Sequence, residues 1–214
     1  MNDPGRVEAI AGMVRMETHD REALGELITE MTHTVYRHEE VYGQYCTVVT
    51  HIDCPARDVF DYMADPRSLP EWTYSVRSLR PTARPGLLVG RDGKDTPIYC
   101  RTVSNAEAMT VDYHCAWDQG DELWMVYLNR VVPAPLVLGR PGAVVVWTNC
   151  RHPYYDANPF PERAPEQRRE WVGDWWPLFY AGHAIELRNL KVLLEHRHRH
   201  GLPIAPRDVP GAEP

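Results

Sequence analysis

Hydrophobic residues recur every three or four positions near the end of the chain. Between Pro165 and His200 the series consists of Val172, Trp176, Phe179, His183, Leu187, Leu190 and Leu194. This spacing places the side chains on one face of an α-helix, so it predicts a long amphipathic helix with that face turned inward. Pro177 falls in its first turns or kinks it, and Gly201-Leu202-Pro203 ends it.

Residues 45–150 show a different pattern, rich in β-branched residues and interrupted by turn residues. The interruptions come at the roughly 8 to 12 residue spacing of an antiparallel sheet. The stretch from Pro133 to Gly142 interrupts in the same way. We therefore expect seven strands, at residues 45–52, 73–80, 87–91, 97–104, 109–117, 122–132 and 143–150.

Two shorter helices precede most of this sheet. Residues 56–64 carry apolar side chains on one side, and Asp65-Pro66 ends the segment because a residue before proline leaves the α region. Residues 21–32 begin behind Asp20 as N-cap, with apolar residues at helical spacing. This pattern predicts an N-terminal extension at 1–44, a domain at 45–200 and a loose, Pro-rich tail at 201–214.

Composition narrows the classes of partner. Asp and Glu number 30 against 23 Lys and Arg, with a pI near 5.8, so we expect no nucleic-acid partner. No targeting leader and no run of about 18 apolar residues is seen, which predicts a soluble, cytoplasmic protein without a membrane partner. Five cysteines without CxxC spacing predict reduced, mostly buried thiols. No glycine-rich nucleotide motif is present, and we expect no cofactor.

Two segments carry a family resemblance. They are THIDCPARDVFDYMADPRSLPEWTYSV at 50–76 and GHAIELRNLKVLLEH at 182–196. With the order of elements, they resemble the START/Bet v1-like (SRPBCC) superfamily, and its polyketide cyclase/dehydratase group most. The resemblance implies an α+β helix-grip fold, a seven-stranded antiparallel sheet wrapped around the long C-terminal helix, here with an N-terminal helical extension. It implies a ligand cavity but no common catalytic motif.

The alternation of strand residues indicates which polar groups could face such a cavity. In 109–117, His114 shares a face with Asp112, either on the solvated outer side or as a cavity acid or base. In 97–104, Arg101 is either an outer-face cation or an anchor for a carboxylate or enolate. Tyr127 and Asn129 offer a hydroxyl and an amide to a carbonyl oxygen. Further candidate contacts are Trp124, Trp147, Asn149, Trp176 and Phe179.

His183 lies on the apolar face of the long helix, with Glu186 three residues on. Burial of both groups favours pairing, and we expect Glu186 to fix the tautomer of the imidazole and raise its basicity. A structural His–Glu contact is the alternative. The spacing also permits two metal ligands, to which His114 or Asp112 could add a third, but without a second such motif we expect no metal.

Two functions remain open from the sequence. The first is a cofactor-independent cyclase or dehydratase acting on a hydrophobic, oxygenated, polyketide-like intermediate. In it His183, Glu186, His114 and Tyr127 are the catalytic candidates, and Arg101 and Asn129 hold oxygens. The second is a carrier or sensor of a hydrophobic small molecule. An oligomer interface is one of the alternative locations for Trp171 and Trp175. The sequence therefore leaves open whether the protein forms a homodimer.

Overall fold

The structure is a computed structural model. It describes residues 22, 26, 45–73, 76–91, 96–117, 122–163 and 176–206, with the side chains of the last range from Gly182 onward. The chain divides into two compact units, Met1–Gly43 and Gln44–Pro214. In the first unit Glu22 and Glu26 are helical, and the rest of the helix expected at 21–32 lies outside the described residues.

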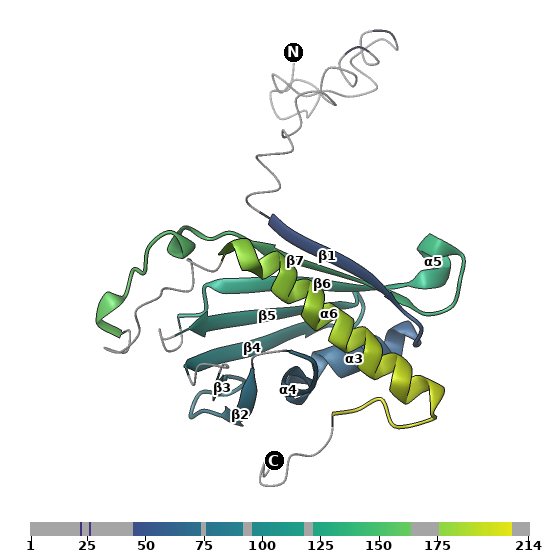
Figure 1. The fold of residues 1–214 in the computed structure, drawn as a ribbon, viewed down its shortest axis with the longest axis horizontal. Coiled ribbons are helices and arrows are strands. Elements are labelled where there is room, and N and C mark those ends of the chain that lie inside the picture. Colours follow the sequence, from purple (N-terminus) through teal and green to yellow (C-terminus); the bar gives the residue numbers. More distant parts are fainter. Residues whose placement is uncertain are drawn as a thin grey trace, which may run out of the picture. The chain divides into compact units, whose positions relative to one another are not determined.

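The second unit is built on a seven-stranded antiparallel sheet, as the alternating pattern predicts (Figure 1). The strand order is β1-β7-β6-β5-β4-β3-β2, so consecutive strands are neighbours except for β1, which pairs with β7. The strands are β1 (Tyr45–Ile52), β2 (Arg77–Pro81), β3 (Leu88–Arg91), β4 (Pro97–Asn105), β5 (Thr110–Trp117), β6 (Met125–Pro133) and β7 (Ala143–Cys150).

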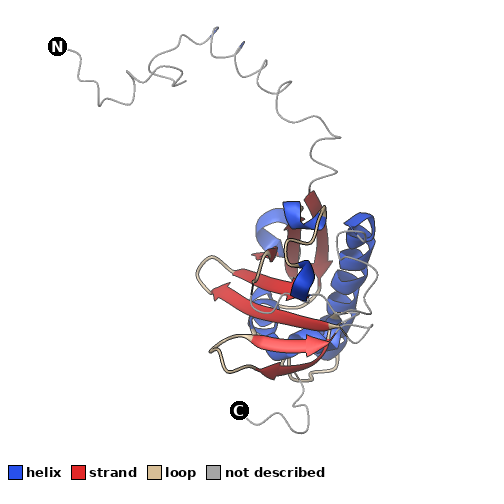
Figure 2. Cartoon of the chain, turned by 90° about the vertical axis from the view of Figure 1, so that its left-hand side faces the viewer, coloured by secondary structure: helices blue, strands red, loops and turns tan. Residues whose placement is uncertain are grey.

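The long helix α6 (Trp176–Arg199) crosses one face of this sheet. Seen from the side in Figure 2, it lies along one side of the strands, and its closest strand is β1. Leu187, Leu190 and Leu194 are buried beneath it, as the apolar stripe predicts. Pro177 is its second residue, where no intrahelical N–H is needed. Gly201, at φ 61°, ends it in the left-handed conformation. The α+β helix-grip architecture is confirmed.

Shorter helices connect the strands. Helix α3 (Ala56–Ala64) has the predicted bounds, and a 3-10 turn, η2 (Pro66–Ser68), follows it. Two further helices, α4 (Leu69–Trp72) and α5 (Ala134–Leu138), occupy segments that we expected to be a turn or connection. Each carries a proline in its first turn, where proline favours a helix start. Such short helices leave no periodic pattern to detect.

The two faces of the sheet differ in burial. The inner face, which α6 covers, includes Val48, Val111, Tyr113, Val131 and Val145, all in the hydrophobic core. The outer face carries the residues that alternate with these along each strand, and many of them are exposed. All five cysteines are free thiols and four are buried, as predicted; Cys150 is exposed. No helix in the described ranges is long and apolar enough to cross a membrane.

A buried ion pair joins the end of α6 to α4. Both terminal nitrogens of Arg197 lie 3.0 Å from the carboxylate oxygens of Glu71, and one also donates to the Ala205 carbonyl at 2.9 Å. The Tyr62 hydroxyl donates to Glu71, and the guanidinium lies 5.4 Å from the centre of the Tyr62 ring. We call these three residues, Tyr62, Glu71 and Arg197, the ion-pair cluster.

Candidate functional site

Four aromatic and amide side chains gather at the centre of the inner face. Tyr127 of β6 lies opposite Asn149 of β7, and Asn129 of β6 lies opposite Trp147 of β7. Strand alternation places all four on the face that holds Val131 and the core. We call these four residues the inner patch. Sequence alternation placed Tyr127 with Asn129 and Trp147 with Asn149 within each strand, and the structure brings the two pairs together.

His183 of α6 covers the inner patch. Its imidazole is buried and stacks on the Trp147 ring at 4.5 Å and 22°, and it meets the Tyr127 ring edge-on at 5.4 Å. Its Nδ1 atom lies 3.5 Å from the Sγ atom of Cys46, which faces Asn149 across the β1–β7 pairing. Helix α6 therefore places one imidazole against the inner patch.

The charge state of His183 differs from our expectation. Burial lowers the pKa of His183 from 6.5 to about 4, so the imidazole is neutral near neutral pH, and its basicity is not raised. Burial also raises the pKa of Cys46 to about 11, which keeps the thiol protonated. The two neutral groups thus share a hydrogen bond rather than form a thiolate–imidazolium pair.

Tyr127 is a neutral hydroxyl at this site. Burial raises its pKa well above the ordinary value of 10, and the charges of Tyr155, Cys115 and Glu186 and a hydrogen bond with Tyr155 add to the rise. Glu186 itself is buried on α6, where its charge also raises the pKa of Cys115. Tyr127 can therefore donate or accept a hydrogen bond, but it is not a phenolate.

Three polar atoms of the inner patch are buried without a hydrogen-bond partner: the Oδ1 atoms of Asn129 and Asn149 and the Nε1 atom of Trp147. The amide nitrogens are occupied, Asn129 Nδ2 by the Tyr127 carbonyl and Asn149 Nδ2 by the Tyr155 hydroxyl, each at 3.3 Å. An unsatisfied buried polar group costs about 1–3 kcal/mol, and native proteins hold few of them. Other such atoms occur elsewhere in the described residues, for example Thr102 Oγ1, but the inner patch holds three of them together.

The other candidates from the strands lie elsewhere. Arg101 and His114 face each other across β4–β5, and alternation puts both on the outer face with Asp112, opposite to Cys100 and Cys115 of the core. The structure does not bring them together with His183. The outer-face alternative for both residues is the one observed. No three His, Cys, Asp or Glu side chains in the described residues gather as metal ligands.

Trp124 precedes β6 instead of lying within it, because that strand begins at Met125. Its ring packs against the Tyr155 ring at 4.9 Å and against the Tyr154 ring at 5.6 Å, beyond the end of β7. It therefore borders the inner patch through Tyr155. The side chains of Trp176 and Phe179 lie outside the described residues.

Cys46 and Tyr155 are contacts of the site that the sequence analysis missed. Cys46 lies in β1 on the same face as Val48, so alternation counted from the apolar residues could have found it. Tyr155 belongs to the 3-10 turn η3 (Pro153–Tyr155), a three-residue element without a periodic pattern. No sequence signal indicates that its hydroxyl meets Asn149.

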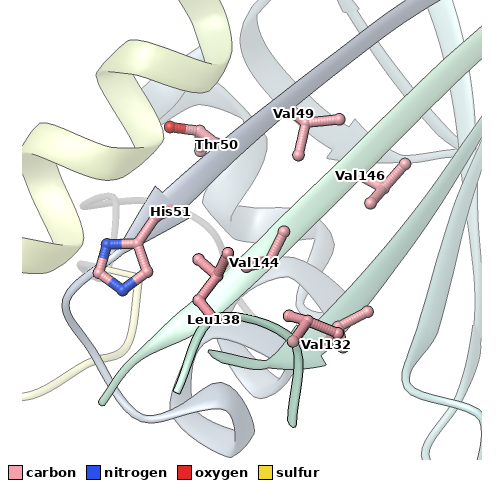
Figure 3. Close-up of a pocket in the computed structure, with 8 residues that line it drawn as sticks. Val49, Thr50, His51, Val132, Leu138, Val144 and Val146 are labelled. Carbon is pink, nitrogen blue, oxygen red and sulfur yellow. The ribbon is translucent and has the colours of Figure 1, made fainter. Parts of the chain in front are cut away.

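A hollow of about 340 Å³ lies on the outer face between β1, β7, β6 and α5 (Figure 3). Its only imidazole, from His51, is 2.8 Å from the Pro141 carbonyl, and the remaining surface is almost wholly apolar. Thr50 and His51 are the polar residues in its lining, so it offers few groups that could orient an oxygenated molecule. Its lining residues are Val49, Thr50, His51, Val132, Val137, Leu138, Val144 and Val146.

Comparisons with protein-family models and with curated proteins find no match for this chain. Among solved structures, it is similar to a START superfamily protein from Mycobacterium smegmatis, with 16% identity, a TM-score of 0.45, and coverage of 73% of this chain and 98% of that one. It is also similar to the Aha1 dimer from Colwellia psychrerythraea, with 12% identity, a TM-score of 0.45, and coverage of 71% and 96%.

A further similar structure is DynU16, a protein of the dynemicin biosynthetic locus, at 10% identity and a TM-score of 0.44. The match covers 76% of this chain and 49% of that one. A START superfamily protein is therefore among the structures that this chain resembles, and the likeness concerns the fold.

Proposed function

We propose that this protein binds a hydrophobic, oxygenated small molecule between α6 and the inner patch and promotes its cyclisation or dehydration without a cofactor. The observation that supports this most is the group of three buried, unsatisfied polar atoms in Asn129, Trp147 and Asn149. A bound ligand with complementary groups would remove their desolvation penalty. Rings and aliphatic side chains around them suit the hydrocarbon part of such a ligand.

In the proposed ring closure, the neutral His183 imidazole removes a proton from the carbon next to a ligand carbonyl. The oxygen of the resulting enolate accepts a hydrogen bond from Trp147 Nε1. The enolate carbon then attacks a second carbonyl carbon, and the imidazolium returns the proton to the new alkoxide. Tyr127, as a neutral hydroxyl, holds the second carbonyl oxygen. The inner patch fixes the conformation in which the two carbons meet.

A carrier without chemistry is the second candidate, and the low pKa of His183 favours it. An imidazole whose pKa burial lowers to about 4 is a weak base near neutral pH. A carrier needs only the hydrogen-bonding groups and the apolar surroundings, with no titrating group.

A synthetic aryl triketone separates the two functions, because ring closure with loss of water converts it to an aryl resorcinol that chromatography with mass spectrometry quantifies. We expect His183→Gln to lower kcat by about 100-fold or more while affinity for the triketone stays within about 2-fold. His198→Gln, the same change at an exposed position of the same helix, is the matched control. Binding without turnover by the wild-type protein would select the carrier.

A further inference from the structure

We propose that the inner patch selects neutral ligands that present hydroxyl donors and rejects anionic ones, a selectivity that rests on the proposed function of this site. The preference follows from the types of atom that the patch leaves unpaired, and from the charges around them. It narrows the substrate class to phenols, enols and neutral hydroxyketones.

The unpaired atoms define what the ligand must supply. Asn129 Nδ2 donates to the Tyr127 backbone carbonyl, so the opposite amide orientation would place two oxygens against each other. The Oδ1 atom of Asn129 therefore points away from that carbonyl and is unpaired. With Asn149 Nδ2 on the Tyr155 hydroxyl, the Oδ1 atom of Asn149 is unpaired as well. Both are acceptors, so only a donor on the ligand satisfies them. Trp147 Nε1 is a donor and needs one acceptor.

The charges of the described residues disfavour an anion at the inner patch. Glu186 is buried on α6, three residues after His183, and its carboxyl group helps to raise the pKa of Tyr127, so an anion at the patch would lie near an acidic side chain. Arg101 and Arg130 lie on the outer face of the sheet. Arg197 is engaged by Glu71, and Arg151, which follows β7, is engaged by Asp156. A carboxylate placed against two amide oxygens would lose its hydration without gaining a counter-charge.

The hydrocarbon part of the ligand has aromatic neighbours. Trp147 is surrounded by rings: His183 stacks on it, Tyr127 meets it edge-on at 6.0 Å, and Trp72 meets it edge-on at 5.6 Å. Flat, conjugated hydroxylated molecules combine ring contacts with the required donors.

Three naphthalenes of nearly equal size test the selectivity by quenching of tryptophan fluorescence. Dihydroxynaphthalene is neutral and offers two donors, dimethoxynaphthalene keeps the oxygens without the donors, and hydroxynaphthoate carries a negative charge. We expect the diol to bind about 10-fold or more tightly than either of the others, because a site with buried polar groups discriminates strongly against a ligand that leaves them unpaired.

Two variants identify the source of the preference. Replacing Asn129 and Asn149 by Leu together removes both acceptors, so the diol and the dimethyl ether should then bind within about 2-fold of each other. Trp147→Phe keeps a ring but removes the donor. It should weaken both neutral ligands alike and leave their ratio unchanged. Asn105→Leu, the same change at the exposed turn between β4 and β5, is the control and should alter neither.

The outcomes separate the two proposals. If all three naphthalenes bind equally well and Trp147→Phe weakens each of them, the selectivity is overturned while the proposed site stands. If none binds, both the selectivity and the site are overturned. A preference for the diol that survives the double Leu variant would place the selecting groups elsewhere and would also overturn the inference.

Discussion

The molecule holds two buried polar groups of residues that differ in how their hydrogen bonds are used. In the ion-pair cluster, both nitrogens of the Arg197 fork reach Glu71, and Tyr62 adds a hydroxyl and a ring face. In the inner patch, Asn129 and Asn149 each leave an oxygen unpaired. The first arrangement is satisfied within the chain, whereas the second leaves acceptors that, in our proposal, a ligand satisfies.

The difference shows what each group of residues contributes. Burying paired charges holds α4 and the end of α6 in place, because removing one partner would leave the other charge buried alone. Burying unpaired amide oxygens costs stability in the free protein, and in our proposal a bound ligand would offset this cost. Mutations should therefore separate the two: stability depends on the ion-pair cluster, and ligand binding depends on the inner patch.

The largest effect is expected for Arg197→Met. It leaves the Glu71 carboxylate without its cation, and we expect unfolding to become easier by about 3 kcal/mol, which lowers the Tm by about 6–12 °C. Thermal unfolding followed by circular dichroism measures it. Arg57→Met, at an exposed ion pair with Asp61, is the control and should change stability by less than about 0.5 kcal/mol. Equal losses in both variants would contradict the role of the cluster.

An intermediate effect is expected for His183 as the pH falls. Its pKa is about 4 in the folded protein and 6.5 ordinarily, so the unfolded chain takes up a proton first. The stability that this group contributes is therefore fully present above pH 6.5 and is lost as the pH falls toward 4.

Urea unfolding of the wild type and of His183→Gln isolates this contribution from those of the other histidines. Between about pH 7 and about pH 5, the wild type should lose about 2 kcal/mol more than the variant. Cys46 and Tyr127, which contact the imidazole, stay neutral throughout this range because burial raises both of their pKa values. Parallel losses in the two proteins would show that His183 titrates normally.

The smallest change in stability is expected for the double replacement of Asn129 and Asn149 by Leu. The change removes two unsatisfied oxygens, which stabilises the fold, and also the hydrogen bonds made by the amide nitrogens, which destabilises it. The two effects on the free energy of unfolding therefore oppose each other. We expect the free energy of unfolding to stay within about 1 kcal/mol of the wild type. A loss of about 3 kcal/mol or more would show that the inner patch stabilises the fold as the ion-pair cluster does.

Much of the fold follows from the sequence because its elements are long and periodic. The stripe that includes Leu187, Leu190 and Leu194 predicted α6, and alternation between turn residues predicted seven antiparallel strands. The helices α4 and α5 were missed because four or five residues with a proline carry no period.

The site was predictable only in part. His183 was detectable as a polar residue on the apolar stripe of the long helix. The inner patch residues were detectable as hydrogen-bonding residues that share a strand face with apolar residues. Alternation with Val111, Tyr113 and Cys115 favoured the outer face for His114. The side of Arg101 was harder to decide, because β4 has polar and apolar residues on both faces. Alternation in β1 could have found Cys46, but not its contact with His183 on a helix distant in sequence. Tyr155 lies in a 3-10 turn without a periodic pattern, so no sequence signal predicted its contact with Asn149.

The central claim is that the unpaired atoms of the inner patch receive a ligand, and the indole N–H of Trp147 reports this directly. It is buried without an acceptor in the free protein, so its proton resonance should move downfield when dihydroxynaphthalene supplies one. The signal is assigned by its disappearance in Trp147→Phe. A two-dimensional nitrogen–proton spectrum that shows this shift, with little change in most other indole signals, supports the account. A Trp147 signal unchanged at saturating diol would contradict it.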